Sequence, residues 1–102
     1  MELHNHNLNI HYSLLHETWD KISNLYSQMP GWINFINGIP YWFGTDEEQK
    51  SISASVEQGG LHFYSRMPNE EWEDWFNLFK EKATELLGFK VGEPEDEFEF
   101  IM

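Results

Sequence analysis

The sequence predicts an α+β domain in which a small antiparallel sheet packs against two amphipathic helices. Two segments, about residues 13–29 and 69–87, repeat apolar residues at spacings of three and four, as expected of helices with one buried face. Between them, residues 51–67 alternate polar and apolar side chains around a glycine pair, which indicates a β-hairpin with flanking strands. The 102 residues suffice for one core, so we expect a single domain over residues 1–102 with an acidic C-terminal tail at 92–102.

The first helix is predicted over about residues 13–29. Ser13 is its candidate N-cap, and Pro30 with Gly31 ends it. The segment before it, "LNIHY" at 8–12, is either a short edge strand or an irregular lead-in. The apolar face of the helix comprises Leu15, Trp19, Ile22, Leu25 or Tyr26, and Met29.

The apolar segment between the first helix and the hairpin allows two interpretations. The Asn-Gly pair at 37–38, with isoleucine on either side, predicts a tight type I′ turn between two strands, because that turn needs positive φ at both central residues. The alternative leaves residues 32–36 irregular or helical. In both, residues 39–43 form a strand, and Pro40 favours a sheet edge or a strand start because it cannot donate a ladder hydrogen bond.

The hairpin at 51–67 is predicted to turn at Gly59-Gly60. On this register the buried face pairs Val56 with Phe63, Ala54 with Ser65, and Ile52 with Met67. The opposite face carries Ser53, Ser55, Glu57, His62, Tyr64 and Arg66. Because that second set is polar, we expect one face of the sheet to be exposed to solvent.

The second helix, at 69–87, has the clearest end signals. Asn69 is its expected N-cap and Gly88 its C-terminal stop. Residues 89–91 can add a last short strand after it. The apolar stripe comprises Trp72, Phe76, Phe79, Ala83, Leu86 and Leu87, with Trp75 at its edge.

Acidic residues outnumber basic residues by 18 to 6, which gives a net charge of −12. They gather in two clusters, in the first turns of the second helix and in the tail: Glu70, Glu71, Glu73 and Asp74, and Glu93, Glu95, Asp96, Glu97 and Glu99. One interpretation is that the helix carboxylates complement the helix dipole and that the tail is solvated. One or two carboxylates suffice for a helix end, so we favour a docking surface for a basic partner.

Three aromatic residues are candidates for the same partner-binding surface. Tyr41 and Trp42 are neighbours on the predicted strand 39–43, so at least one of them should face outward, and Tyr64 lies on the polar face of the hairpin. Exposed aromatic rings beside charged groups are typical of binding hot spots. The alternative is that a small core uses every aromatic residue, and for Trp42 the two interpretations stand equal.

The residues that could carry chemistry do not form a recognisable site. His4 and His6 would lie on one side of a strand, but no third ligand follows at a metal-site spacing, so we predict no metal. The carboxylates are expected to be exposed and therefore unsuited to general acid–base catalysis, and no phosphate-binding loop or nucleophile motif occurs. We predict no catalytic residues, no cofactor and no enzymatic activity. His62 and Glu57 are interpreted as a surface contact.

Composition also constrains the compartment and the partners. The absence of cysteine is compatible with a reducing cytoplasm, and neither a signal peptide nor a membrane-spanning segment is recognisable, so we expect a cytoplasmic protein. A strongly acidic surface repels nucleic acid and anionic membranes, which bind through lysine and arginine. We therefore expect a monomer that binds neither, and whose partner is a basic protein.

The motifs "IPYWFG", "ISASVEQGGLHFY" and "NEEWEDWFNLFKEKATELLGFKVGEPED" resemble the small acidic immunity proteins of bacterial polymorphic-toxin and contact-dependent growth inhibition systems. The resemblance covers about residues 39–97 and rests on size, acidity and a hairpin followed by a tryptophan-rich acidic helix. It implies a cognate partner, the C-terminal toxin domain of a large secreted protein, frequently a basic nuclease. It transfers a role but no catalytic residue. The competing classes are an interaction adaptor, a nucleic-acid mimic and, less favoured, a small enzyme.

Overall fold

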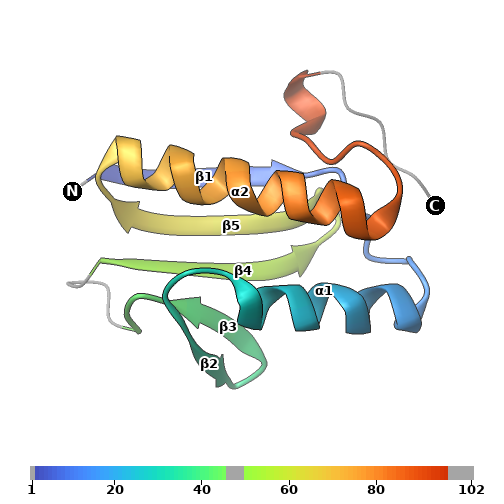
Figure 1. Cartoon of the computed structure of the whole chain (residues 1–102), viewed down its shortest axis with the longest axis horizontal. Coiled ribbons are helices and arrows are strands. Elements are labelled where there is room, and N and C mark those ends of the chain that lie inside the picture. The colour runs from blue at the N-terminus through green and yellow to red at the C-terminus, as the bar shows by residue number, and fades with distance from the viewer. Residues whose placement is uncertain (1, 46–49, 97–102) are drawn as a thin grey trace.

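The computed structural model describes residues 2–45 and 50–96 and contains a five-stranded antiparallel sheet with two helices (Figure 1). The strands lie in the order β1-β5-β4-β3-β2, and every neighbouring pair is antiparallel. This arrangement confirms the predicted α+β class. The elements are β1 (Glu2–Leu8), α1 (His16–Gln28), β2 (Trp32–Ile36), β3 (Ile39–Trp42), β4 (Ser51–Glu57), β5 (Gly60–Met67), α2 (Asn69–Leu87) and the short 3-10 helix η1 (Pro94–Asp96).

Both helices cover the same face of the sheet. Figure 1 shows α2 in front of β1 and β5, and α1 alongside β4 next to the β2–β3 hairpin. The core lies between these layers, where Trp42 of β3 meets Tyr26 of α1 and Phe63 of β5 meets Phe79 of α2, with ring centroids 5.3 and 5.0 Å apart. No helix of the described residues lies over the opposite face, as the polar face of the hairpin predicted.

The tryptophans of the core satisfy their indole N–H groups inside the protein. Trp42 is 0% exposed and donates from Nε1 to the carbonyl oxygen of Tyr26 at 2.9 Å. Trp75 is 4% exposed and donates to the carbonyl oxygen of Pro30 at 3.0 Å. Burial of a tryptophan requires such a partner. Trp42 is thus a core residue and not part of a partner-facing surface, and Trp75 lies inside the apolar stripe instead of at its edge.

The Asn-Gly turn forms as predicted and decides between the two interpretations of residues 32–43. Asn37 and Gly38 have φ values of 53° and 81°, and the flanking Ile36 and Ile39 pair directly. Residues 32–36 are therefore a strand, with a register irregularity between Trp32 and Asn34.

The hairpin of β4 and β5 keeps its predicted faces but not its predicted register. Glu57 pairs with Gly60, so the turn is Gln58-Gly59 and not Gly59-Gly60, and Ala54 pairs with Phe63. Every partner is shifted by two residues. Because side chains alternate with a period of two, this shift leaves each residue on its expected face.

The two predicted N-caps were wrong, although α2 spans the predicted residues 69–87. Helix α1 begins at His16, and the Ser13 hydroxyl does not cap it but lies 2.6 Å from Nδ1 of His11. Helix α2 begins at Asn69, and the capping position is Pro68, whose carbonyl oxygen accepts from the Trp72 N–H. Pro68 itself is extended, with φ of −57° and ψ of 143°, and it starts the helix without a side-chain cap. Gly88, with φ of 78°, ends α2 as predicted.

The two outermost segments also differ from the predictions. The edge strand β1 spans residues 2–8 and pairs with β5 along its whole length, so it lies before the 8–12 segment, of which residues 9–12 form no strand and match the alternative of an irregular lead-in. Residues 89–91 form no strand. They are fixed by side-chain hydrogen bonds instead, which a strand pattern in the sequence cannot reveal.

Candidate protein-interaction surface

The four carboxylates at the start of α2 are all exposed. Glu71 forms an ion pair with Lys50, whose Nζ lies 2.5 Å from Oε1. At 100° per residue, Glu70, Glu73 and Asp74 each lie within about 60° of Asn77 around the helix axis, whereas Glu71 lies about 120° from it on another flank. Asn77 lines a cleft beside the C-terminal segment. Three of the four N-terminal carboxylates therefore lie on the side of α2 that borders this cleft.

A buried asparagine fixes the start of the C-terminal segment. The Asn9 side chain is 1% exposed; its Nδ2 donates to the carbonyl oxygen of Lys90 at 3.0 Å, and its Oδ1 accepts from the Gly92 N–H at 2.9 Å. The Asn9 N–H donates to the Gly92 carbonyl oxygen, and the Val91 N–H donates to Oγ1 of Thr84 on α2, both at 2.9 Å. The predicted tail is thus tethered to the domain at its first residues.

Glu93 brings the second acidic cluster alongside α2. Its Oε2 accepts from Nδ1 of His6 at 3.0 Å, and the His6 ring stacks on Trp72 with centroids 5.6 Å apart. The His4 ring also stacks on Trp72, and its Nε2 donates to the Met67 carbonyl oxygen. The two histidines lie on one side of β1, as predicted, where they pack between the strand and α2.

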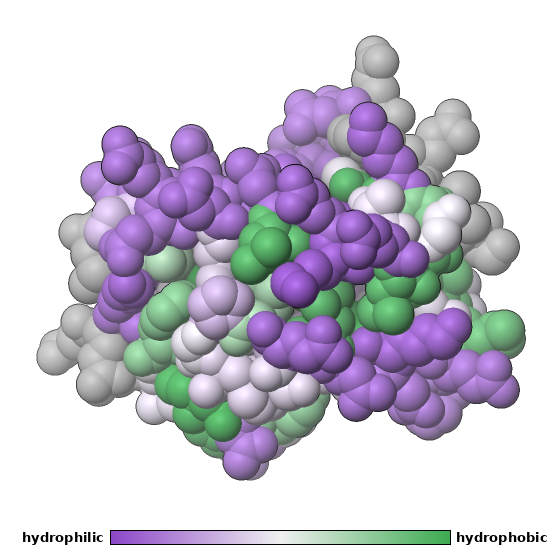
Figure 2. Space-filling model, viewed as in Figure 1, coloured by the Kyte–Doolittle hydropathy of each residue, from purple (hydrophilic) through white to green (hydrophobic). Residues whose placement is uncertain are grey.

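The cleft between α2 and the C-terminal segment has a volume of about 870 Å³. Four carboxylates and two lysines line it: Glu81, Glu85, Glu93, Asp96, Lys80 and Lys90. Figure 2 shows hydrophilic residues over most of this side of α2. Sequence reasoning did not select Glu81 and Glu85, although their spacing of four residues on the polar side of the helix was a signal for a shared flank.

The predicted partner-binding residues divide between two faces. Glu70, Glu71, Glu73, Asp74, Glu93, Glu95 and Asp96 lie on α2 or beside it, whereas Tyr41 and Tyr64 lie on the open face of the sheet. Trp42 belongs to the core. Glu97 lies outside the described residues. The structure therefore joins the two acidic clusters but separates them from the tyrosines.

Few other groups in the described ranges suggest chemistry. Within residues 2–45 and 50–96, no three metal-ligating side chains converge on one point. Burial raises the pKa of Tyr26 well above its usual value, since the phenolate would lose its hydration inside the core. No helix in the described part of the chain is long and apolar enough to cross a membrane.

Comparisons of the chain with protein-family models, with curated proteins and with solved structures find no match.

Proposed function

We propose that this protein is an immunity protein that binds and neutralises a cognate basic toxin domain, for which a nuclease is the best fit. The supporting observation is an acidic surface that joins one flank of α2 to the C-terminal turn. We define this acidic surface as Glu70, Glu73, Asp74, Glu81, Glu85, Glu93, Glu95 and Asp96.

The chemistry of the acidic surface suits the binding of a protein whose own substrate is a phosphate polymer. A nuclease binds its polyanionic substrate through lysine and arginine, and carboxylates can occupy the same groups in place of phosphates. Glu93 is the one member of the acidic surface that forms an ion pair with another described residue. The other carboxylates keep their charge for a partner, and opposite charge accelerates association.

The C-terminal turn is fixed before any partner arrives. Asn9 and Thr84 hold residues 90–92 through hydrogen bonds of 2.9–3.0 Å. Ordering a segment on binding costs free energy, so a turn that is already in place favours tight binding. The proposal includes a cytoplasmic location, where a toxin that has entered the cell would be met, and a one-to-one complex.

The test is an affinity measurement against the C-terminal domain of the large protein encoded beside this gene. We compare the wild type with the double variant Glu73→Lys/Glu95→Lys and with a control, Glu17→Lys/Asp20→Lys on α1, which changes the net charge equally. Calorimetry at low and at physiological salt should show at least about tenfold weaker binding for the first variant and less than about twofold for the control. Circular dichroism verifies that both are folded. Equal losses in both variants, or none in either, would contradict the acidic-surface proposal.

A second candidate function is an adaptor that binds through apolar surface. Residues 30–45 contain no charged side chain, and Ile33, Phe35, Ile36 and Ile39 of the β2–β3 hairpin are each about two-fifths exposed. Figure 2 shows an apolar area at this end of the molecule. An adaptor would bind with little salt dependence and would lose affinity on Ile36→Asp. An immunity protein that binds through the acidic surface would show strong salt dependence and little loss of affinity on Ile36→Asp.

A further inference from the structure

The only arginine of the chain lies on the face of the sheet that the helices leave open. Arg66 is half-buried and forms no ion pair within residues 2–45 and 50–96. Alternation along the strands puts one carboxylate on this face, Glu57, at the other end of β4 from Ser51, which pairs with Arg66. Six residues of strand separate those ends by roughly 20 Å. Within residues 2–45 and 50–96 the half-buried guanidinium thus has no carboxylate partner, which leaves its donors available to an added anion.

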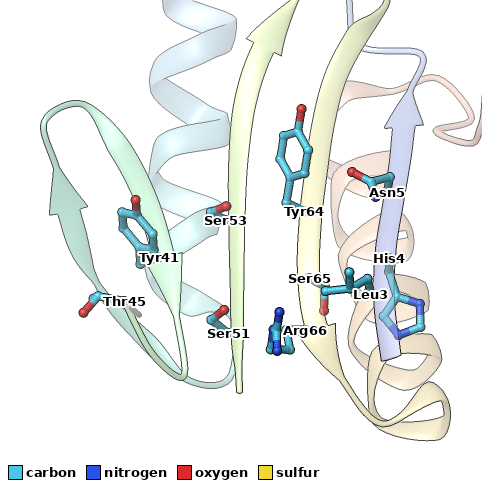
Figure 3. A pocket seen from close by; sticks show the side chains of 10 residues that line it. All are labelled: Leu3, His4, Asn5, Tyr41, Thr45, Ser51, Ser53, Tyr64, Ser65 and Arg66. Atoms are coloured by element: carbon cyan, nitrogen blue, oxygen red, sulfur yellow. The ribbon is translucent and has the colours of Figure 1, made fainter. Parts of the chain in front are cut away.

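Arg66 borders a depression of about 660 Å³ on the open face (Figure 3). Tyr41, Ser53 and Tyr64 lie opposite one another on three adjacent strands, and Ser51 and Arg66 form the next row. Strands are about 4.8 Å apart, so the two tyrosines stand about two strand spacings from each other over a floor of serine. The result is a slot with aromatic walls, hydroxyl groups at its base and a guanidinium at one end.

One wall of the slot is held by its neighbours. The His62 ring meets the Tyr64 ring edge-on, with centroids 4.3 Å apart. Nδ1 of His62 is hydrogen-bonded to Oδ1 of Asn7, and Nε2 lies 3.4 Å from Oδ1 of Asn5. Two asparagines of β1 thus orient the histidine, and the histidine positions the tyrosine. Such support pre-organises a site before its ligand arrives.

We propose that this slot binds an acidic side chain, aspartate or glutamate, of a partner protein. The planar fork of Arg66 matches a carboxylate in two parallel hydrogen bonds, and the serine and tyrosine hydroxyls can donate to its remaining lone pairs. The tyrosine rings would cover the aliphatic stem of the same side chain. Arginine and tyrosine are the residue types most enriched at binding hot spots.

The charge of the acidic surface does not prevent this binding. The acidic surface lies on the helix layer, about 10 Å or more behind the sheet, and the Debye length at physiological salt is about 8 Å. The slot is therefore screened from most of those carboxylates. The slot lies apart from the acidic surface, so its binding of a carboxylate does not depend on the proposed function.

The test uses a capped glutamate, N-acetyl-glutamate N-methylamide, as the probe in an NMR titration of the whole protein. The capped glutamine is the neutral control, and inorganic phosphate tests whether any anion suffices. We expect saturable shifts at Ser51, Ser53, Tyr64 and Arg66 with capped glutamate, and at least about tenfold weaker binding of capped glutamine and of phosphate.

Variants identify the group responsible. Arg66→Gln should abolish the saturable shifts, Arg66→Lys should weaken binding several-fold because it keeps charge but loses the fork, and Lys21→Gln on α1 should change nothing. The dispersion of each spectrum reports whether the variant is folded, and if Arg66→Gln is not, Tyr64→Phe, which removes one hydroxyl, takes its place with an expected several-fold loss. Shifts that do not saturate, equal binding of capped glutamine or of phosphate, or undiminished binding by the variants would overturn the proposal.

Discussion

Asn9→Ala is the substitution that most directly tests how the C-terminal turn is held. The side chain is 1% exposed and bonds to Lys90 and Gly92 in a segment with no strand partner of its own. Two lost hydrogen bonds cost about 1 kcal/mol each, and leaving the buried Gly92 N–H without its acceptor adds about 1–2 kcal/mol. We therefore expect the free energy of unfolding to fall by about 3–4 kcal/mol.

The assay is urea unfolding followed by tryptophan fluorescence, with hydrogen exchange as a local readout. For an m-value of about 1–3 kcal/mol per M, the midpoint should fall by at least about 1 M. Amides at 91–96 should exchange faster than those of the β4–β5 ladder. Asn24→Ala, an exposed position on α1, is the control and should lie within about 0.5 kcal/mol of the wild type. A loss below about 1 kcal/mol for Asn9→Ala, or unchanged exchange at 91–96, would refute the tethering argument.

Three further predictions concern a turn glycine, a core tyrosine and a surface ion pair. Gly31→Ala should lower the free energy of unfolding in urea by at least about 2 kcal/mol, because φ at this position is +84° and the added Cβ would lie 2.6 Å from the Phe43 ring. A loss under about 0.5 kcal/mol would contradict this prediction. Burial raises the pKa of Tyr26, so the stability that the neutral phenol contributes is complete below its unfolded pKa of about 10. Above about pH 10 the free energy of unfolding should fall by at most about 1.4 kcal/mol per pH unit. Tyr26→Phe should reduce this alkaline slope, and an identical slope in the variant would contradict the assignment. Lys50→Ala should cost less than about 1 kcal/mol, because its ion pair with Glu71 is largely solvated; a larger loss in the same assay would show that the pair is structural.

The parts of the fold that local rules govern could be predicted from the sequence. The Asn37-Gly38 turn requires positive φ at both positions, and the alternation in β4 and β5 fixes which residues face the core. The hairpin register could not be fixed in the same way, because Gln58-Gly59 and Gly59-Gly60 are both acceptable two-residue turns and both preserve the faces. Trp42 was undecided because a strand residue next to an edge strand is buried only if a helix covers it.

The candidate site depends on contacts between segments far apart in the chain. The link between the two acidic clusters depends on Asn9, His6 and Glu93. Glu93 lies more than eighty positions along the chain from both Asn9 and His6. No periodicity reveals such pairings. That Arg66 has no ion-pair partner among residues 2–45 and 50–96 is likewise a property of the folded sheet, since in the sequence it stands four residues from Glu70.

The measurement that tests the central proposal most directly is growth rescue. The C-terminal domain of the large protein encoded beside this gene is induced in a bacterial host, together with the wild type, with Glu73→Lys/Glu95→Lys, or with the control Glu17→Lys/Asp20→Lys. We predict rescue and a one-to-one complex on gel filtration for the wild type and the control, and weakened rescue for the acidic-surface variant. A toxic domain that the folded wild-type protein neither neutralises nor binds would contradict the account.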